Sequence, residues 1–143
     1  MVKVLFDSNI LVDIMNGVPQ ARTEASYYSD ITISAITWME VMVGCVQPVQ
    51  AVQFQTFLTR LAVNVIHTND AIALAAVQIR MTGLMATPRR QIRLPDAIIS
   101  ATAQTLGLTV ITRDPSDFSG NAVRVPYQID AGGVVVNVLP PPA

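Results

Sequence analysis

Short apolar, β-branched segments alternate with longer helical patterns along this sequence of 143 residues. Strands that are apolar at nearly every position are typical of parallel sheets, which helices cover on both faces. The alternation therefore predicts an α/β fold, with a central parallel β-sheet flanked by α-helices on both faces. We expect strands at 2–6, 31–34, 63–66 and 108–112, edge strands at 124–127 and 134–139, and helices at 8–16, 21–28, 37–46, 49–60, 70–81 and 96–106.

The length and composition indicate one folded domain over residues 1–143, with a tail from about residue 128 to 143 of undefined role. Hydrophobic residues make up 51% and charged residues 13%, and the formal charge is −1. Such low charge argues against a disordered chain, and the isoelectric point of 5.6 argues against a generally basic nucleic-acid binder. Any contact with nucleic acid is therefore expected at a local patch.

Cysteine and histidine usage excludes several kinds of site. The single cysteine, Cys45, cannot form an internal disulfide, and with one histidine, His67, a Cys- or His-rich metal site is not expected. This usage fits a reducing, cytoplasmic setting. The uncharged stretch 41–59 contains four glutamines and a proline, so no membrane span is expected there. The excess of apolar residues instead predicts a subunit or partner interface.

Five carboxylates in mainly apolar surroundings are the candidates for chemistry. Asp7 directly follows the first strand, and Asp114 and Asp117 follow the strand 108–112. Asp96 opens a helix that carries no further charge, and Glu40 has tryptophan, methionine and valine as neighbours. Ligands of parallel sheets bind beyond the carboxyl ends of the strands, which is where these acids are expected.

Each of these acids also has a structural explanation. Asp7, Asp96 and Asp114 are suited to helix caps, first turns or other turns, and Glu40 with Thr37 has the spacing of a capping box. Glu40 is the hardest to explain in this way, because its neighbours predict a helix that is buried on most faces. An unpaired carboxylate there would cost several kcal/mol or stay protonated.

Few cations are available to neutralise these acids from within the chain. Lys3 is the one lysine, and half of the eight arginines lie between residues 80 and 93. If the acids converge, a divalent cation is the simplest neutraliser, and an all-oxygen site selects Mg²⁺ or Mn²⁺. Such an ion lowers the pKa of bound water and stabilises charge on a phosphoryl oxygen. The chemistry that this predicts is phosphoester hydrolysis.

Four motifs in this order carry a family resemblance. They are Asp7-Ser8-Asn9 after the first strand, residues 35–41 around Glu40, residues 94–103 around Asp96, and residues 112–118 around Asp114 and Asp117. With these motifs the chain resembles PIN-domain nucleases and, more narrowly, the VapC-type toxins of bacterial toxin–antitoxin pairs. The resemblance covers the chain to about Tyr127.

The resemblance implies a PIN fold and a Mg²⁺- or Mn²⁺-dependent endoribonuclease in the cytoplasm, which hydrolyses RNA with a metal-activated water. It also implies a homodimer and a small cognate antitoxin that blocks the site. By position, Asp7, Glu40, Asp96 and Asp114 would be the acidic metal set, with Asn9 and Thr112 in support. Relatives often have asparagine at the position of Asp114 and use the acid three residues on. The fourth ligand is therefore either Asp114, which we prefer, or Asp117.

Arginines are expected to contact the RNA. Arg89, Arg90 and Arg93 lie between two prolines just before Asp96, as a flexible basic arm suited to phosphate contact, although a solvated surface loop would have the same composition. Arg113 is next to the predicted site and either binds phosphate or pairs with a carboxylate.

A second function remains open on the same scaffold. The chain could be a non-catalytic PIN-like module that binds RNA or another protein. The presence of all the proposed acids favours the enzyme, because a domain that has lost its activity tends to lose them.

Overall fold

The structure, a computed structural model, describes residues 2–143 and contains a five-stranded parallel sheet at its centre. The strand order is β3-β2-β1-β4-β5, so the chain builds outward from β1 in both directions. Every neighbouring pair in this sheet is parallel. The strands are β1 (Val4–Phe6), β2 (Ile31–Ser34), β3 (Asn64–Ile66), β4 (Thr109–Ile111) and β5 (Val123–Arg124).

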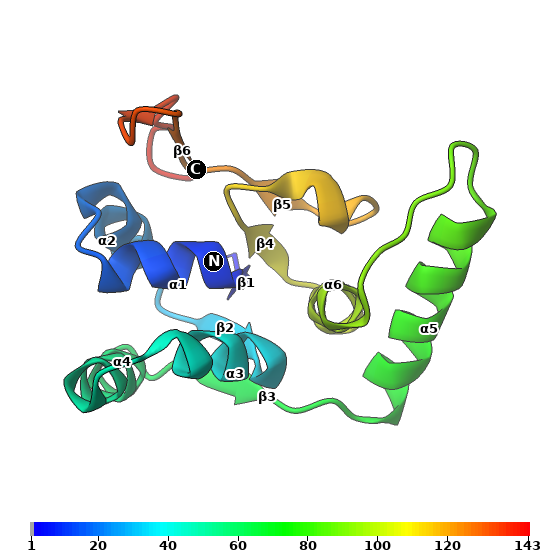
Figure 1. The fold of residues 1–143 in the computed structure, drawn as a ribbon, viewed down its shortest axis with the longest axis horizontal. Helices are drawn as coiled ribbons and strands as arrows, with labels where there is room; N and C mark the ends of the chain where they lie inside the picture. Colours follow the sequence, from blue (N-terminus) through cyan, green and yellow to red (C-terminus); the bar gives the residue numbers. More distant parts are fainter. Residues whose placement is uncertain (1) are drawn as a thin grey trace.

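Helices cover both faces of the sheet, as the sequence predicts (Figure 1). On one side lie α1, α2 and α4, and on the other lies α6, with α5 outside it. None of the helices in residues 2–143 is long and apolar enough to cross a membrane. Their bounds are α1 (Ser8–Met15), α2 (Pro19–Ser26), α3 (Ala35–Gly44), α4 (Pro48–Arg60), α5 (Asp70–Met85) and α6 (Leu94–Leu106), with a short 3₁₀ helix η1 (Pro115–Phe118).

The alternation of side chains along the strands divides the core between the two faces. Val4 and Phe6 of β1 point into the cluster under α1, α2 and α4, whereas Leu5 packs against α6 through Ile99. Helix α5 packs on α6 rather than on the sheet, through Ile72 and its neighbours. One face of α5 therefore stays exposed, although the sequence pattern is apolar all around that helix.

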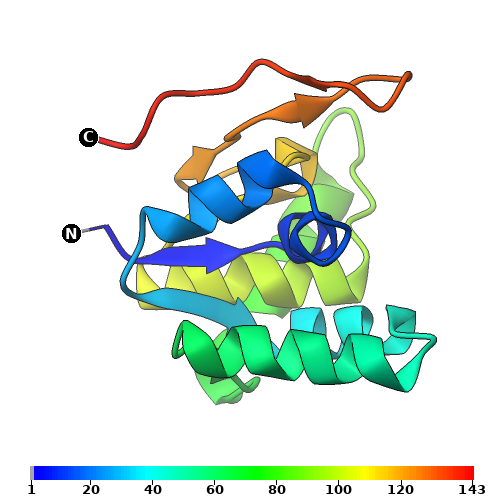
Figure 2. The same cartoon turned by 90° about the vertical axis from the view of Figure 1, so that its left-hand side faces the viewer.

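The C-terminal segment folds differently from the prediction. An edge strand does pair with β4, but it is β5 at Val123–Arg124 rather than 124–127, and residues 134–139 do not join the central sheet. Instead β6 (Gln128–Ile129) and β7 (Val135–Val136) form an antiparallel pair of their own. The reason is a tight turn, in which Asp130 Oδ1 accepts the N–H groups of Gly132 and Val134, both at 2.9 Å. The resulting hairpin lies on the same side of the molecule as α1 and α2 (Figure 2).

Candidate metal centre at the carboxyl edge of the sheet

Asp7 stands at the carboxyl end of β1 and is held by its neighbours in a fixed orientation. Its Oδ1 accepts the N–H of Ser8 at 2.8 Å, so it does cap α1. Its Oδ2 accepts the hydroxyl of Thr112 at 2.8 Å and the side-chain amide of Asn9 at 3.3 Å. Thr112 follows β4 and is fully buried. The structure thus brings together Asp7 and the two residues that the sequence predicts as its support.

Asp7 and Glu40 both lie within the electrostatic influence of Asp96. Burial raises the pKa of Asp7, hydrogen bonds from Thr112 and Ser8 lower it, and the charge of Asp96 raises it again. The pKa of Glu40 is also raised, first by burial and then by the charges of Asp96 and Asp7. The charge of Asp96 in α6 thus opposes ionisation of both Asp7, directly after β1, and Glu40 in α3.

Glu40 lies at the rim of this site rather than in the core. The predicted burial of its helix on most faces is wrong, because Met39 is 46% and Val43 85% exposed, and Glu40 itself is exposed. The capping-box explanation is wrong as well. Helix α3 begins at Ala35 and its cap is Ser34, whose hydroxyl accepts the N–H of Ile36. Glu40 is thus inside the helix, free of a capping role.

Asp114 and Asp117 differ in what they contact. Asp114 caps η1, since its Oδ1 accepts the N–H of Ser116 at 3.2 Å and the Ser116 hydroxyl at 2.7 Å, and these hydrogen bonds lower its pKa. The pKa of Asp117 is raised, first by burial and then by the charges of Asp96 and Asp114. Asp117 is therefore the acid of this loop that shares the electrostatic environment of Asp96.

The donor set fits a hydrated hard cation. All of its candidate ligands are oxygen atoms, which Mg²⁺ and Mn²⁺ prefer, whereas zinc sites usually contain nitrogen or sulfur ligands. Within residues 2–143, no group of three or more acidic, histidine or cysteine side chains is arranged to enclose an ion. An ion at this edge would therefore take only one or two of these carboxylates at a time and keep several waters, as Mg²⁺ usually does.

The arginine-rich segment before α6 is tied down rather than flexible. The backbone N–H of Arg90 donates to Gly83 of α5 at 2.8 Å, and Ile92 is buried. The guanidinium of Arg90 donates to the Ser119 hydroxyl at 2.6 Å and to the backbone carbonyl of Ser116. The prediction of a flexible arm is therefore wrong at Arg90, whose side chain connects this segment to the loop after β4.

The other arginines have different surroundings. Arg93 is 74% exposed and its Nε lies 3.1 Å from Asp96 Oδ2, beside the acidic cluster. Arg89 is exposed. Arg113 forms a bidentate ion pair with Asp13, with its Nε 2.7 Å from Oδ2 and Nη2 3.2 Å from Oδ1. Of the two roles predicted for Arg113, the structure has the pairing with a carboxylate.

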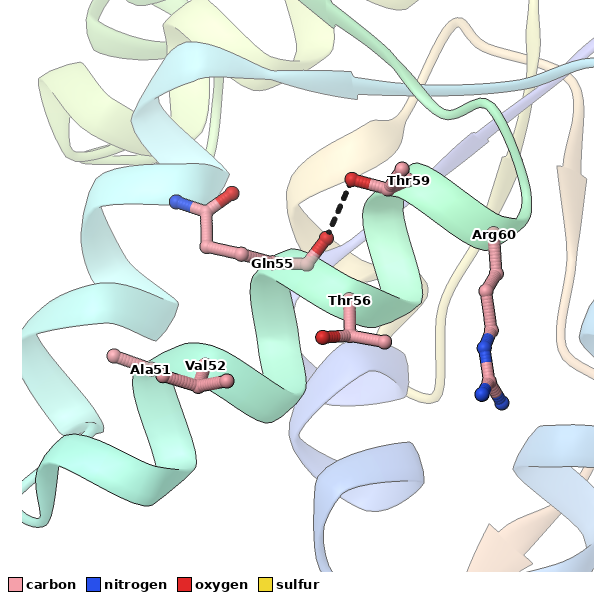
Figure 3. Close-up of a pocket in the computed structure, with 6 residues that line it drawn as sticks. All are labelled: Ala51, Val52, Gln55, Thr56, Thr59 and Arg60. Carbon is pink, nitrogen blue, oxygen red and sulfur yellow. Dashed lines mark hydrogen bonds between the residues drawn. The ribbon is translucent and has the colours of Figure 1, made fainter.

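The larger hollows of the surface lie away from the acids. One of about 430 Å³ follows α4, and its lining includes threonines and Arg60 but no carboxylate (Figure 3). Another of about 520 Å³ lies between α1, α2 and α4. A smaller hollow of about 120 Å³ is lined by Glu40 together with Val12 and Asn16 of the α1 region. Of these three hollows, the smallest is the one lined by a candidate acid, Glu40.

The sequence matches the family model of the PIN domain over residues 4–122. The chain belongs to the PIN domain family. No curated protein matches the sequence. Among solved structures, a chain of a toxin-antitoxin complex from Klebsiella pneumoniae is 38% identical, with a TM-score of 0.75, and the match covers 89% of this chain and 100% of that one. The resemblance to VapC-type PIN toxins is confirmed.

More distant PIN structures share the fold. VapBC-1 from nontypeable Haemophilus influenzae is 23% identical with a TM-score of 0.70, and the match covers 87% of this chain and 97% of that one. Mycobacterium tuberculosis VapC20, a sarcin-ricin loop cleaving toxin, is 18% identical with a TM-score of 0.62, covering 86% and 98%. These matches confirm the α/β/α architecture of the chain.

Sequence reasoning missed one residue beside the site. Asp13 lies six residues after Asp7 in the otherwise apolar helix α1 and is 4% exposed. An acid among apolar residues is the signal that singles out Glu40 in the sequence, and it applies equally to Asp13. Its partners, Arg113 and Tyr127, lie far away in the chain, so the pattern alone does not identify them.

Proposed function

We propose that this chain is a Mg²⁺- or Mn²⁺-dependent endoribonuclease that acts in the cytoplasm as the toxin of a type II toxin–antitoxin pair. The observation that carries the proposal is the position of Asp7 at the carboxyl end of β1, where Thr112 and Asn9 orient it and the charge of Asp96 raises its pKa. The charges of Asp96 and Asp7 also raise the pKa of Glu40, and among residues 2–143 the exposed Arg93 is the one ion-pair partner of these three acids. A divalent cation would relieve the repulsion between these charges. The likeness to the Klebsiella pneumoniae chain of a toxin-antitoxin complex supports the same function.

The residues at this site would have two roles, namely to bind the ion and to orient its ligands. Asp7 and Asp96 would hold the ion, with Glu40 and Asp117 bound directly or through water. When bound, such an ion lowers the pKa of a coordinated water and stabilises charge on phosphorus-bound oxygens. Asn9 and Thr112 would keep Asp7 in its orientation, since both donate to its Oδ2. We assign the fourth acid to Asp117 rather than Asp114, because the charge of Asp96 raises the pKa of Asp117, whereas the pKa of Asp114 is set by its hydrogen bonds with Ser116.

We infer the substrate from the exposed arginines of the segment before α6 and the dimer interface from the exposed apolar side chains of α5. Arg93, which lies beside Asp96, and Arg89 are exposed and would contact RNA phosphates, where charge supplies much of the affinity. A cognate antitoxin would block the site. A homodimer would form through the exposed stripe of α5, which contains Leu74, Val77, Met81 and Met85.

The test is cleavage of a mixed RNA pool by the purified chain with Mg²⁺, Mn²⁺ or EDTA. The parent protein should cut RNA with either metal and not with EDTA, and Asp96→Asn should abolish cutting without loss of fold. Asp130→Asn is the matched control, because Asp130 lies in the β6–β7 turn and asparagine keeps the accepting Oδ1. Co-purified antitoxin has to be removed first.

Two outcomes would contradict the proposal. Cutting by Asp96→Asn at the parent rate would show that the nuclease activity resides elsewhere or comes from a contaminant. A folded, antitoxin-free protein that cuts no RNA with any metal, yet binds RNA, would favour the non-catalytic module.

A further inference from the structure

Two buried networks of the same chemical composition tie the C-terminal part of the chain to the N-terminal helices. In the first, Asp13 of α1 pairs with Arg113 and accepts the hydroxyl of Tyr127 at 2.7 Å. In the second, Glu24 of α2 pairs with Arg124 at 2.8 Å and accepts the hydroxyl of Tyr28 at 2.5 Å. The carboxyl groups are 6% and 3% exposed. Each network therefore contains a buried acid, a bidentate arginine and a tyrosine.

Only the first network continues into the candidate metal centre in the part of the chain that the structure describes. The backbone N–H of Arg113 donates to Asn9 Oδ1 at 3.2 Å. The amide of Asn9 in turn donates to Asp7 Oδ2 at 3.3 Å and to Thr112 Oγ1 at 3.1 Å. A continuous chain of contacts thus runs from Tyr127 to Asp7. In the second network, Arg124 donates instead to the backbone carbonyl of Pro140 in the tail.

We propose that Asp13, Arg113 and Tyr127 are positioning residues for the metal centre, acting through Asn9 on Asp7. Asp13 holds the guanidinium of Arg113 with two hydrogen bonds, which restrains the adjoining backbone. That backbone fixes the side-chain amide of Asn9, whose amide nitrogen must then face Asp7 and Thr112. Groups that orient a metal ligand commonly affect activity as strongly as some of the ligands do. This inference rests on the proposed nuclease function, because RNA cleavage is the reaction that these residues would support.

Tyr127 makes this arrangement depend on the segment after the matched domain. The PIN model ends at residue 122, whereas Tyr127 is fully buried and its hydroxyl closes the Asp13 network. The next residues form the β6–β7 hairpin, which packs on the same core through Ile129 and Val135. The C-terminal segment of this chain would therefore help to keep the metal ligand in place, rather than only cover the surface.

The experiment compares Tyr127→Phe with Tyr28→Phe in the full-length chain. Each change removes one hydroxyl that donates to a buried, arginine-paired carboxylate, so both should lower the melting temperature by similar amounts. Tyr127→Phe should lower kcat for RNA cleavage about tenfold with KM for RNA changed less than about twofold, whereas Tyr28→Phe should leave both near the parent values. In Asn9→Ala, adding Tyr127→Phe should cause little further loss, because both act on one path.

A second measurement does not depend on activity. In metal-free protein, NMR signals of the Asn9 side-chain amide and the Arg113 backbone amide should shift and exchange faster with solvent in Tyr127→Phe, and not in Tyr28→Phe. Equal behaviour of the two variants in both measurements would overturn the inference. If the parent chain cuts no RNA, the proposed function fails, and the NMR comparison alone still decides whether Tyr127 positions Asn9.

Discussion

Replacing Glu40 by glutamine should stabilise the metal-free protein while weakening its stabilisation by metal. Partial burial opposes ionisation of the Glu40 carboxyl group most, and the charges of Asp96 and Asp7 oppose it further. Two like-charge neighbours at about 0.2–0.5 kcal/mol each give a gain of about 0.4–1 kcal/mol in the free energy of unfolding. We use this surface magnitude because Glu40 is exposed and water screens its charge. For a chain of this size the melting temperature should rise by about 1–4 °C.

The sign of the effect can be checked against pH. The pKa of Glu40 in the folded protein is raised above its ordinary value of 4.5, so the folded state binds a proton more readily than the unfolded state. The ionised carboxylate therefore costs stability at pH 7, and this cost vanishes as the pH falls through the raised pKa to the ordinary value. The advantage of Glu40→Gln should accordingly be full at neutral pH and disappear in acid.

The assay is thermal unfolding with EDTA and then with Mg²⁺, at low and high salt. The parent should gain stability with Mg²⁺, the variant should gain much less, and high salt should shrink their difference without metal. Asp70→Asn is the control, because Asp70 is an exposed acid in the first turn of α5, where its negative charge stabilises the helix. Loss of this charge should slightly lower the stability of the protein. A Glu40→Gln protein that is less stable than its parent at neutral pH would refute the reasoning.

Three further predictions test other parts of the structure. Asp117→Asn should weaken Mg²⁺ affinity about tenfold and Asp114→Asn much less, as measured by titration calorimetry, and the reverse order would restore Asp114 as the fourth acid. Gly83→Ala should lower the free energy of unfolding in urea by about 1–3 kcal/mol, because the added Cβ would lie 2.7 Å from the Arg90 carbonyl oxygen. In the control, Gly44→Ala, the added Cβ meets no atom within 4 Å, so this variant should be slightly more stable than the parent. Met81→Glu should convert a dimer to monomers in light scattering, and a dimer that persists would exclude the α5 stripe as its interface.

The parts of the fold that follow local patterns are predictable from the sequence. Apolar β-branched segments become the parallel strands, and Gly107, in the left-handed region at φ +67°, ends α6 where the pattern ends. The hairpin of the tail is not predictable in this way, because a strand pattern does not say which partner it pairs with. The turn chemistry of Asp130 decides that question locally and against the central sheet.

The candidate site is predictable to the extent that it depends on strand ends. Asp7 and Thr112 meet because β1 and β4 are parallel neighbours, paired from Val4 with Thr109 to Phe6 with Ile111. Glu40 and Asp117 are harder, since their roles depend on which way a helix or a short loop turns its side chains. The exposure of α3 shows the difficulty, because an apolar sequence around Glu40 indicated burial where the structure has an open surface.

The distribution of arginines distinguishes the buried acids Asp13 and Glu24 from the acids of the candidate metal centre. Asp13 and Glu24 are nearly fully buried, and each receives a bidentate arginine from about a hundred residues away, so the fold supplies a full counter-charge where it buries an acid. At the edge of the sheet the fold does the opposite. Within residues 2–143, Asp7, Glu40 and Asp117 have no ion pair, and Asp96 has only the exposed Arg93.

A chain with so few charges would gain stability by pairing these acids or replacing them. That these acids have one exposed arginine as an ion-pair partner within residues 2–143 supports the proposed cation site, since perturbed carboxylates cluster at functional sites. The same contrast explains why the two tyrosine networks deserve separate tests. Both networks neutralise a buried acid, but the network of Asp13 also contacts the candidate metal centre through Arg113 and Asn9. Tyr127→Phe and Tyr28→Phe should therefore lower the melting temperature by similar amounts, whereas only Tyr127→Phe should change the kcat for RNA cleavage and the NMR signals of Asn9.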